Sequence, residues 1–508
     1  MEWDDLLKLS LLGTERIGLP PELLHRMEQA GADVDGDAAS ILAQAVSLLS
    51  LEYRAGLPLA VVDIERLPAP PEAAQNATVA CSALSVRHLQ MILNGDFGAA
   101  LREFVEVAQQ YQRTLPPIAL PDLLTKSVNN LEFWELVQPL TGARTEWLIQ
   151  LNPAWRSLRT VIDSKWWETG NTDERHLYLQ RLRQYDPQRA TELLQERFSE
   201  LDRTEQLALL KLLKRKSGDY DEAFLETQLK ARRKEVRRQA AELLSRLPDS
   251  AYVQAIFDQV IPLINYRKKN IQVELPDLPE ANQNGLQLPI NLKDYTGGAR
   301  ADYLGQLLER IPPDRWESLF DAEPSVALRT WLESNEPDLV RLALVRATLR
   351  FEDVHWREAL LRHWVARPDQ PTWKRKAATR LLRTTSAELF NSIALDYLQR
   401  NPGLINEDTA VGRWVKKGQH RWTEAVSILI IKGLQHYLRE LQDDYWHSRK
   451  YQTLLRAAGY RAHPNALERL KGGWDFTAPN WQHWEPEIER MLRTVIFRKN
   501  MRHALATN

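Results

Sequence analysis

The chain has 508 residues, and its 67 lysines and arginines nearly balance its 68 aspartates and glutamates. This balance removes any global electrostatic argument for binding nucleic acid or an anionic membrane. The single cysteine excludes an internal disulfide and an all-cysteine zinc site, and 21 glycines with 27 prolines are too few for a collagen-like or linker-like chain.

The N-terminal residues Met1–Asp5 are acidic, whereas a secretory signal begins with a basic segment. The longest apolar stretches, at 41–51 and 426–431, are shorter than the ~18 apolar residues that a membrane span requires. We therefore expect a cytoplasmic protein with no membrane association.

Nearly every segment has the pattern of a short amphipathic helix, and residues 170–250 show it most clearly. Asp186-Pro187 and Asp202 supply N-terminal caps, and further helices are predicted to begin near residues 221 and 235. These starts are only about 14 to 18 residues apart, so each helix must pack antiparallel against its neighbours in sequence. The spacing predicts a helical solenoid.

Two breaks in the helical pattern suggest a domain order. Residues 57–74 contain four prolines, which predicts an extended connector or a wall packed on the first helices. The expected organisation is an N-terminal helical region at 1–130, a first helical-repeat segment at 131–264, an extended insertion at 265–297 and a second helical-repeat segment with a C-terminal cap at 298–508.

The insertion at 265–297 is the longest stretch without a helical pattern. Apolar residues alternate with polar ones on both sides of Asn284-Gly285, namely Ile271, Val273 and Leu275 before it and Leu286, Leu288 and Ile290 after it. This alternation predicts a β-hairpin or an extended arm. Long excursions of this kind are often functional, which makes Ile271, Val273 and Leu275 candidate protein-interaction residues. A packed insertion that seals two halves of the solenoid is an equal alternative.

Residues 224–244 resemble one HEAT repeat. A first helix at 224–230 is followed by a second that opens with Val236-Arg237 and carries Ala240-Ala241. The small alanines let two helices approach closely, and the arginine near the helix start ties neighbouring repeats together. The resemblance implies an all-α fold, an irregular HEAT-like α-α superhelix with a short extended or β-hairpin insertion.

The chain also resembles an uncharacterised bacterial family of helical-repeat proteins. The resemblance rests on four motifs, at 11–16 (LLGTER), 151–155 (LNPAW), 298–304 (GARADYL) and 312–316 (PPDRW). Genes of that family often neighbour those of a MoxR-type AAA+ ATPase, a von Willebrand factor A domain protein and a SWIM zinc-finger protein. Because the family has no established activity, the resemblance implies a setting rather than a mechanism.

Two further segments of the chain resemble each other. Residues 141–148 and 296–304 each combine a glycine turn with the predicted start of a helix. They are predicted to open two related helical segments, unless they have converged on the same turn chemistry.

The charges are unevenly distributed although they cancel overall. Residues 1–80 hold 13 acidic and 5 basic side chains, 229–246 hold 7 basic and 2 acidic, and 341–383 hold 11 basic and 4 acidic. The basic helix start contains Arg232, Arg233, Lys234, Arg237 and Arg238. This set is a candidate surface for phosphates or an acidic protein partner, whereas a solvated helix face is the alternative.

Most of the 17 tryptophans are expected to fill gaps between irregular helices. Trp474, Trp481 and Trp484 lie instead among glycine, proline and asparagine residues, a composition typical of a loop. Exposed aromatics of this kind are enriched in interfaces, so these three are candidate protein-interaction anchors.

The sequence carries no motif for chemistry. It contains no GxSxG, P-loop, GxGxxG or HExxH pattern, so we identify no catalytic, cofactor-binding or metal-binding residues. We expect a non-enzymatic scaffold or adaptor whose leading partner is an AAA+ ATPase/von Willebrand factor A module. The alternative is a nucleic-acid-binding HEAT-like solenoid that uses its basic helix starts, and the third possibility is an enzyme whose site the sequence does not reveal.

Overall fold

The protein is described from a computed structural model of the whole chain. The residues that the structure describes are 3–14, 18–56, 69, 71, 79–159, 164–267, 270–279, 286–288, 294–295, 297–367, 376–403, 405, 409–440, 445–478 and 481–507. The fold is all-α, as predicted, and the strands of the described residues form just two short pairings.

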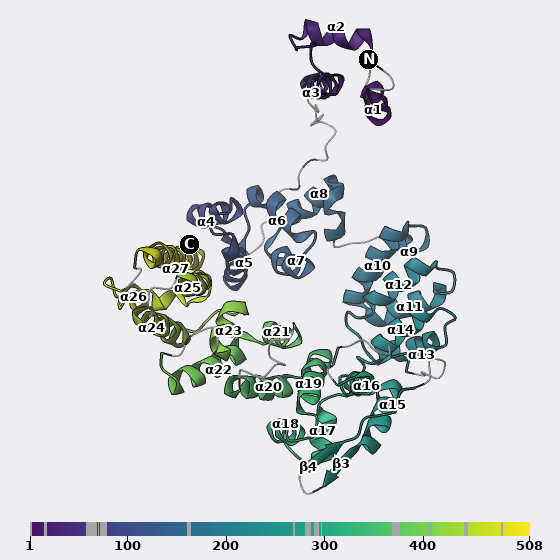
Figure 1. Cartoon of the computed structure of the whole chain (residues 1–508), viewed down its shortest axis with the longest axis vertical. Helices are drawn as coiled ribbons and strands as arrows, with labels where there is room; N and C mark the ends of the chain where they lie inside the picture. Colours follow the sequence, from purple (N-terminus) through teal and green to yellow (C-terminus); the bar gives the residue numbers. More distant parts are fainter. Residues whose placement is uncertain are drawn as a thin grey trace. The chain divides into compact units, whose positions relative to one another are not determined.

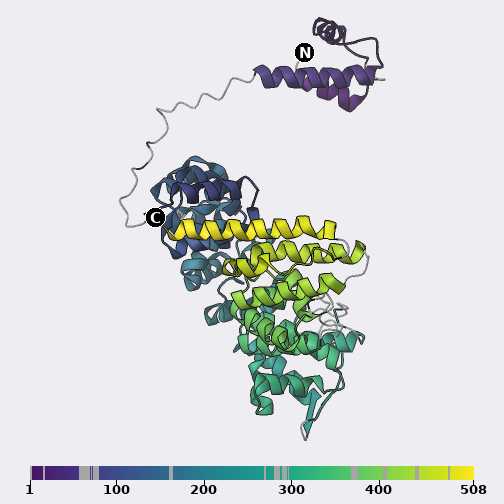
Figure 2. The same cartoon turned by 90° about the vertical axis from the view of Figure 1, so that its left-hand side faces the viewer.

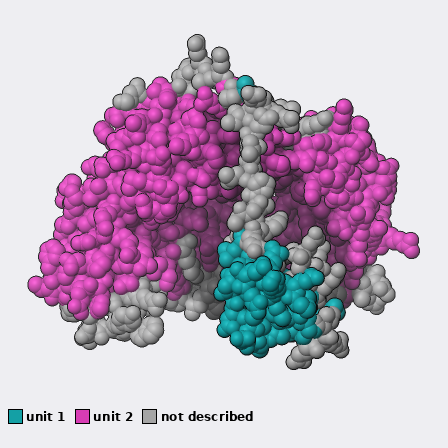
Figure 3. Space-filling model, turned by 90° about the horizontal axis from the view of Figure 1, so that it is seen from above, with its two compact units in different colours: residues 1–70 teal, residues 71–508 magenta. Residues whose placement is uncertain are grey.

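The chain divides into two compact units, Met1–Pro70 and Pro71–Asn508 (Figure 3). Unit 1 contains α1 (Trp3–Leu12), α2 (Pro21–Gln29) and α3 (Ala38–Gly56). Its small core is formed by Leu6, Leu9, Leu23, Met27, Leu42 and Ala45. The expected N-terminal region at 1–130 therefore spans unit 1 and the first helices of unit 2, while most of the predicted connector at 57–74 lies outside the described residues.

Unit 2 begins with a group of short elements. They are β1 (Val79–Ala80), α4 (Ala83–Leu93), η2 (Gly98–Ala100), α5 (Leu101–Gln110), β2 (Arg113–Thr114), η3 (Pro117–Ala119), α6 (Leu120–Ser127), α7 (Leu131–Val137), η4 (Gln138–Leu140), α8 (Ala143–Leu151) and η5 (Pro153–Leu158). Strands β1 and β2 are parallel, with Val79 opposite Arg113. Helix α8 begins directly after Gly142, as its glycine motif predicted.

The next group confirms the helix starts predicted near 187, 203, 221 and 235. It contains α9 (Lys165–Glu168), α10 (Thr172–Tyr185), α11 (Pro187–Arg197), α12 (Arg203–Leu212), η6 (Asp219–Asp221), α13 (Glu222–Leu229), α14 (Lys234–Leu244), α15 (Ala251–Val260) and η7 (Ile261–Leu263). The Asp186 carboxylate accepts the backbone N–H of Arg189, and Asp202 accepts those of Thr204 and Glu205. These two aspartates therefore act as the predicted helix caps.

The hairpin in the 265–297 region differs from the predicted one. Strand β3 (Ile264–Arg267) pairs antiparallel with β4 (Asn270–Val273), so Ile271 faces Tyr266. The predicted β-hairpin is therefore present in the 265–297 region, but both of its described strands precede Asn284-Gly285 in the chain. Among the described residues beyond β4, Leu286 and Leu288 are buried instead, and Asn284, Gly285 and Ile290 lie outside the described residues.

The rest of unit 2 consists of helices. They are α16 (Ala299–Leu308), α17 (Asp314–Phe320), α18 (Pro324–Leu332), α19 (Pro337–Phe351), α20 (Val354–Ala366), α21 (Lys376–Arg383), α22 (Ala387–Arg400), α23 (Ala410–Lys417), α24 (Glu424–Glu440), α25 (Tyr445–Arg461), η9 (Pro464–Ala466), α26 (Leu467–Lys471) and α27 (Trp481–Ala506). Buried tryptophans fill this part, and Trp316 packs edge-to-face on Trp331 as Trp364 does on Trp414.

Many helices of unit 2 are arranged in two rows. The first row has two parts, α10, α12 and α14, then α16, α19, α21, α23, α25 and α27, and within each part every helix contacts the next. Helix α15 contacts both α14 and α16 and so joins the two parts. The second row contains α18, α20, α22, α24 and α26. A single hydrophobic core from Trp167 to Val495 lies between and around the rows. Such an array agrees with the predicted solenoid of antiparallel neighbours.

The C-terminal helix α27 packs against the first helices of unit 2. Helix α27 contacts α4 and α5 as well as α25 (Figures 1 and 2). Arg498 of α27 forms an ion pair with Glu103 of α5, and both side chains are buried. On the other side of the same group, Arg156 of η5 pairs with Glu174 of α10. The first elements of unit 2 therefore contact both the helices that follow them and the C-terminal helix.

No helix among the described residues combines the length and apolar character that crossing a bilayer requires.

Candidate functional site

A cationic pocket lies where the two halves of the first helical row meet. Its volume is about 360 Å³. Its lining includes five basic side chains, which we call the cationic pocket residues: Arg246, Arg346, Arg350, Lys376 and Arg380. Asp294, Glu309, Leu349 and Ala377 complete the lining. The pocket is therefore polar and carries an excess of positive charge.

Helix periodicity places these residues together. Arg346 and Arg350 are four residues apart on α19, and Lys376 and Arg380 are four apart on α21. Residues with this spacing lie one above the other on the same helix face. Since α19 packs against α21, the two pairs line one cavity, and Arg246 joins them from the turn that follows α14.

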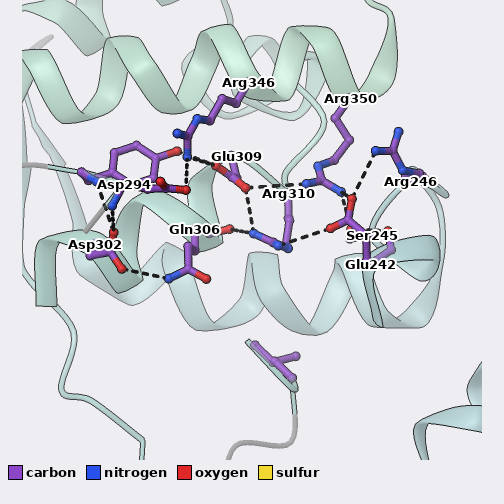
Figure 4. Close-up of polar contacts among 12 residues, drawn as sticks. Glu242, Ser245, Arg246, Asp294, Asp302, Gln306, Glu309, Arg310, Arg346 and Arg350 are labelled. Atoms are coloured by element: carbon purple, nitrogen blue, oxygen red, sulfur yellow. Dashed lines mark hydrogen bonds and ion pairs between the residues drawn. The ribbon is translucent and has the colours of Figure 1, made fainter. Parts of the chain in front are cut away.

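The loop before α16 carries Asp294 and Tyr295, and α16 holds their backbone in place. The Asp302 carboxylate accepts the backbone N–H groups of Asp294 and Tyr295, at 2.9 and 3.1 Å (Figure 4). The Tyr295 ring lies against Gly305, where a Cβ atom would approach the ring to 2.6 Å. A glycine is thus needed at this point of α16 for the close approach of Tyr295.

Glu309 is the central carboxylate of the site. It accepts hydrogen bonds from the Tyr295 hydroxyl at 2.6 Å and from Arg346 at 2.9 Å, and it pairs with Arg310 at 3.0 Å. Burial raises the pKa of Tyr295 well above its usual value, and the negative charge of Glu309 raises it further. Tyr295 is therefore a neutral hydrogen-bond donor and not a base.

Glu242, near the end of α14, is a second carboxylate that binds several arginines. It pairs with Arg350 at 2.9 Å, Arg246 at 3.2 Å and Arg310 at 3.4 Å (Figure 4). Burial alone would raise the pKa of Glu242, but Arg350 and Arg310 outweigh it and hold that pKa below the usual range. Glu242 is therefore ionised at neutral pH and links α14 to α16 and α19.

The carboxylates do not neutralise the cluster. The five cationic pocket residues face two lining carboxylates, Asp294 and Glu309, which leaves the lining with a formal charge of +3. Arg310 and Glu242 lie beside the lining and offset each other. Neither Lys376 nor Arg380 pairs with a carboxylate of the described residues. The buried Nε atoms of Arg246 and Arg350 also find no acceptor within the described part of the chain.

The pKa of the nearby Lys214 is lowered by this excess of positive charge. Repulsion from Arg246 lowers the pKa of its ammonium group, and burial and Arg380 lower it further. An opposing carboxylate would raise the pKa of a lysine instead. The positive charge at the pocket is therefore large enough to disfavour a further cation.

We predict that Lys214→Gln stabilises unit 2 at neutral pH by less than about 1 kcal/mol, because it removes a repelled but largely exposed charge. Because the pKa of Lys214 is lower in the folded than in the unfolded chain, the penalty is fully present at low and neutral pH. It begins to fall as pH rises through the folded-state pKa and is gone above the unfolded-state pKa. The melting temperature of the variant should exceed that of the wild type at pH 7, and the difference should shrink toward pH 10. Lys211→Gln, an exposed change on α12, is the control, and a lower melting temperature for Lys214→Gln would contradict the prediction.

Residues 5–505 match DUF5691, which is described as a family of unknown function. The chain belongs to the DUF5691 family. No curated protein and no solved structure matches it. Membership in DUF5691 agrees with the expected uncharacterised family but assigns no activity.

The DUF5691 chain places its predicted basic residues in two different environments. Arg232, Arg233, Lys234 and Arg238 are exposed at the start of α14, whereas Arg237 is partly buried and donates to the carbonyl of Ala231 at 2.9 Å. None of these five lines the cationic pocket. The basic residues of the pocket lining are instead one from the end of the basic stretch 229–246 and four from the basic stretch 341–383.

The tryptophan anchors need a correction. Trp474 is 7% exposed and donates from Nε1 to the Leu470 carbonyl at 2.8 Å, and Trp484 is 1% exposed. Trp481 and Trp484 lie in α27 and not in a loop, because the helix begins directly after the turn-forming residues. The exposed aromatic of this region is Phe476, which is 72% exposed and packs edge-to-face on the partly buried Trp481.

The three candidate interaction residues of the 265–297 region do not lie on a projecting arm. Ile271 and Val273 are buried and Leu275 is partly buried, all against the main core. Val273 exchanges two backbone hydrogen bonds with the Asn335 side chain, at 2.8 and 3.0 Å. The described part of the 265–297 region therefore supports the packed insertion over the projecting arm.

The described residues bring no three metal-ligating side chains together. Cys81, which precedes α4, is not activated, since burial raises its pKa to about 11.

Proposed function

We propose that this protein is a non-enzymatic scaffold or adaptor that binds a partner protein, with the cationic pocket receiving an acidic group of that partner. The observation that carries the proposal is the formal charge of +3 at a preformed pocket between α14, α16, α19 and α21. A site of this charge attracts anions and orients them at short range.

The chemistry of the pocket lining supports binding more than catalysis. Arginine stays protonated in proteins and acts as neither base nor nucleophile. The carboxylates that line the pocket, Asp294 and Glu309, each face Arg346, at 3.4 and 2.9 Å. Strong ion pairing suits fixed donors that recognise an anion, whereas a general base must be available to accept a proton.

The array of unit 2 supports a role in assembly. Two rows of helices present an extended surface, and such arrays bind partners through many weak contacts with a few strong anchors. The sequence resemblance makes an AAA+ ATPase/von Willebrand factor A module the leading candidate for the partner, and a cytoplasmic location fits such a complex.

The proposal is tested by affinity capture of the tagged full-length chain from its native cell, followed by mass spectrometry. The wild type should enrich a defined protein, and K376E/R380E should reduce that protein at least tenfold because both exposed side chains line the pocket. Arg383→Glu on the same helix lies outside the pocket lining and should capture as the wild type does. Equal capture by all three proteins, or no reproducible partner, would contradict the proposal.

A nucleic-acid-binding function is the second candidate, and the exposed cluster Arg232, Lys234 and Arg238 favours it. Contacts to phosphates would make the affinity fall steeply with salt. The variant R232E/R238E should then abolish a mobility shift with DNA or RNA at low salt, whereas K376E/R380E should leave it unchanged. The absence of any shift by the wild type at low salt removes this candidate.

A further inference from the structure

We infer that the ligand of the cationic pocket is a polyvalent phosphate group, of the size and charge of a diphosphate or triphosphate. The inference rests on the proposed function in one respect, since both place an acidic group in the pocket. It goes further by naming the chemistry of that group, and it is tested without any partner protein.

The shape of the pocket limits the ligand to a small and highly charged group. A volume of about 360 Å³ is at the lower end of the range for ligand sites, which is about 300–1,000 Å³. Apart from Leu349 and Ala377, every residue that lines it is charged. An apolar or neutral ligand would leave these groups desolvated without a partner.

The amount of charge distinguishes phosphates from carboxylates. A carboxylate side chain carries a single negative charge, so three of them would be needed to balance the formal charge of +3. A phosphate monoester carries about −1.5 to −2 at pH 7. Two linked phosphates therefore supply a charge of this size within one compact group, whereas three acidic side chains would have to converge on the same small volume.

Two of the arginines are already held in place for such a ligand. Arg350 has a side chain that is 10% exposed, and its Nη1 atom donates to Glu242 at 2.9 Å and to Ser245 at 2.6 Å. Its buried Nε has no acceptor within the described residues, and the same is true of Arg246. A guanidinium fixed by existing hydrogen bonds loses little entropy when it donates a further bond to a phosphate oxygen.

Lys376 and Arg380 of α21 can donate to the same ligand as Arg246 and Arg350. Lys376 and Arg380 are exposed on the first turns of α21, and neither pairs with a described carboxylate. Lysine and arginine four residues apart can contact successive phosphates, arginine by bidentate hydrogen bonds and lysine as a point charge. No aromatic side chain of the described residues lines the pocket, so the surface offers no platform on which a nucleic-acid base could stack.

The test is calorimetric titration of the full-length chain at low ionic strength with inorganic phosphate, diphosphate and triphosphate. Diphosphate or triphosphate should bind at least ten times more tightly than phosphate and should raise the melting temperature in a saturable way. K376Q/R380Q should weaken binding at least tenfold, and Arg383→Gln should leave it unchanged. Affinity should also fall as salt is added.

A further titration with adenosine diphosphate distinguishes a free polyphosphate from an organic phosphate ester. Equal affinity for diphosphate and adenosine diphosphate supports a free polyphosphate anion, and tighter binding of adenosine diphosphate supports an organic diphosphate ester. The inference is overturned if no polyphosphate binds, if K376Q/R380Q binds as the wild type does, or if a tetraglutamate peptide binds more tightly than diphosphate. A chain that binds diphosphate but captures no partner contradicts only the proposed function, and the reverse result contradicts only this inference.

Discussion

Arg498→Met is expected to lower the free energy of unfolding of unit 2 by about 3–5 kcal/mol, the loss typical when one member of a buried ion pair is removed. The Arg498 side chain is 1% exposed and that of Glu103 is 4% exposed. Arg498 also donates to the carbonyls of Gly459 and Ala462, at 3.0 and 2.8 Å. Methionine fills a similar volume but leaves Glu103 with Arg502 alone, at 3.1 Å, and leaves both carbonyls without this donor.

Urea unfolding followed by circular dichroism measures this loss. Arg493→Met is the matched control, because Arg493 lies on the same helix with a side chain that is 71% exposed and should contribute at most about 1 kcal/mol. Arg498 joins α27 to α5, so hydrogen exchange should rise first in those two helices. An unchanged urea midpoint for Arg498→Met would show that the closure of unit 2 does not depend on this pair.

The elements that could be predicted from the sequence are those with local signals. Asp186 and Asp202 cap helices because a carboxylate can accept N–H groups two or three residues ahead, and this needs no tertiary information. Gly142 and Gly298 mark the starts of α8 and α16 for a similar reason. Where partners are distant, the prediction was incomplete. Strand β4 is held by Asn335, which is 62 residues away from Val273 in the chain.

In the candidate site, too, local features could be predicted from the sequence, whereas contacts between distant residues could not. Counting charges identified the basic stretches at 229–246 and 341–383, and both contribute to the pocket. The count could not show which arginines are neutralised, because Arg350 and Glu242 are 108 residues apart and meet only through tertiary packing. Exposure was equally inaccessible, since Trp474 and Trp484 lie beside turn-forming residues yet are buried. Locating this site therefore required both the distribution of charges along the sequence and the packing of the helices.

The second large effect on the free energy of unfolding is expected at Arg183, which is also buried. Arg183→Met is expected to cost about 3–5 kcal/mol because the Arg183 and Asp221 side chains are 0% and 1% exposed. Arg183 of α10 donates to the carbonyls of Leu213 and Arg215, at 3.0 and 2.8 Å, and to that of Pro187 at 2.8 Å. One side chain thus ties α10 to α11 and to the turn after α12.

The double variant Arg183→Met with Asp221→Asn tests whether this cost comes from the unpaired charge. If an isolated buried carboxylate causes the loss, the double variant should be more stable than the sum of the single variants predicts, with a coupling of about 1–3 kcal/mol. If the loss comes instead from the unbonded carbonyls, the two single effects should add. Arg189→Met, which removes a half-exposed surface pair with Glu192, should cost at most about 1 kcal/mol in the same urea series. Because α10, α12 and α14 are successive helices of the first row, a loss at Arg183 should also weaken the contacts of α14. Helix α14 in turn positions Glu242, which pairs with Arg350 of the cationic pocket.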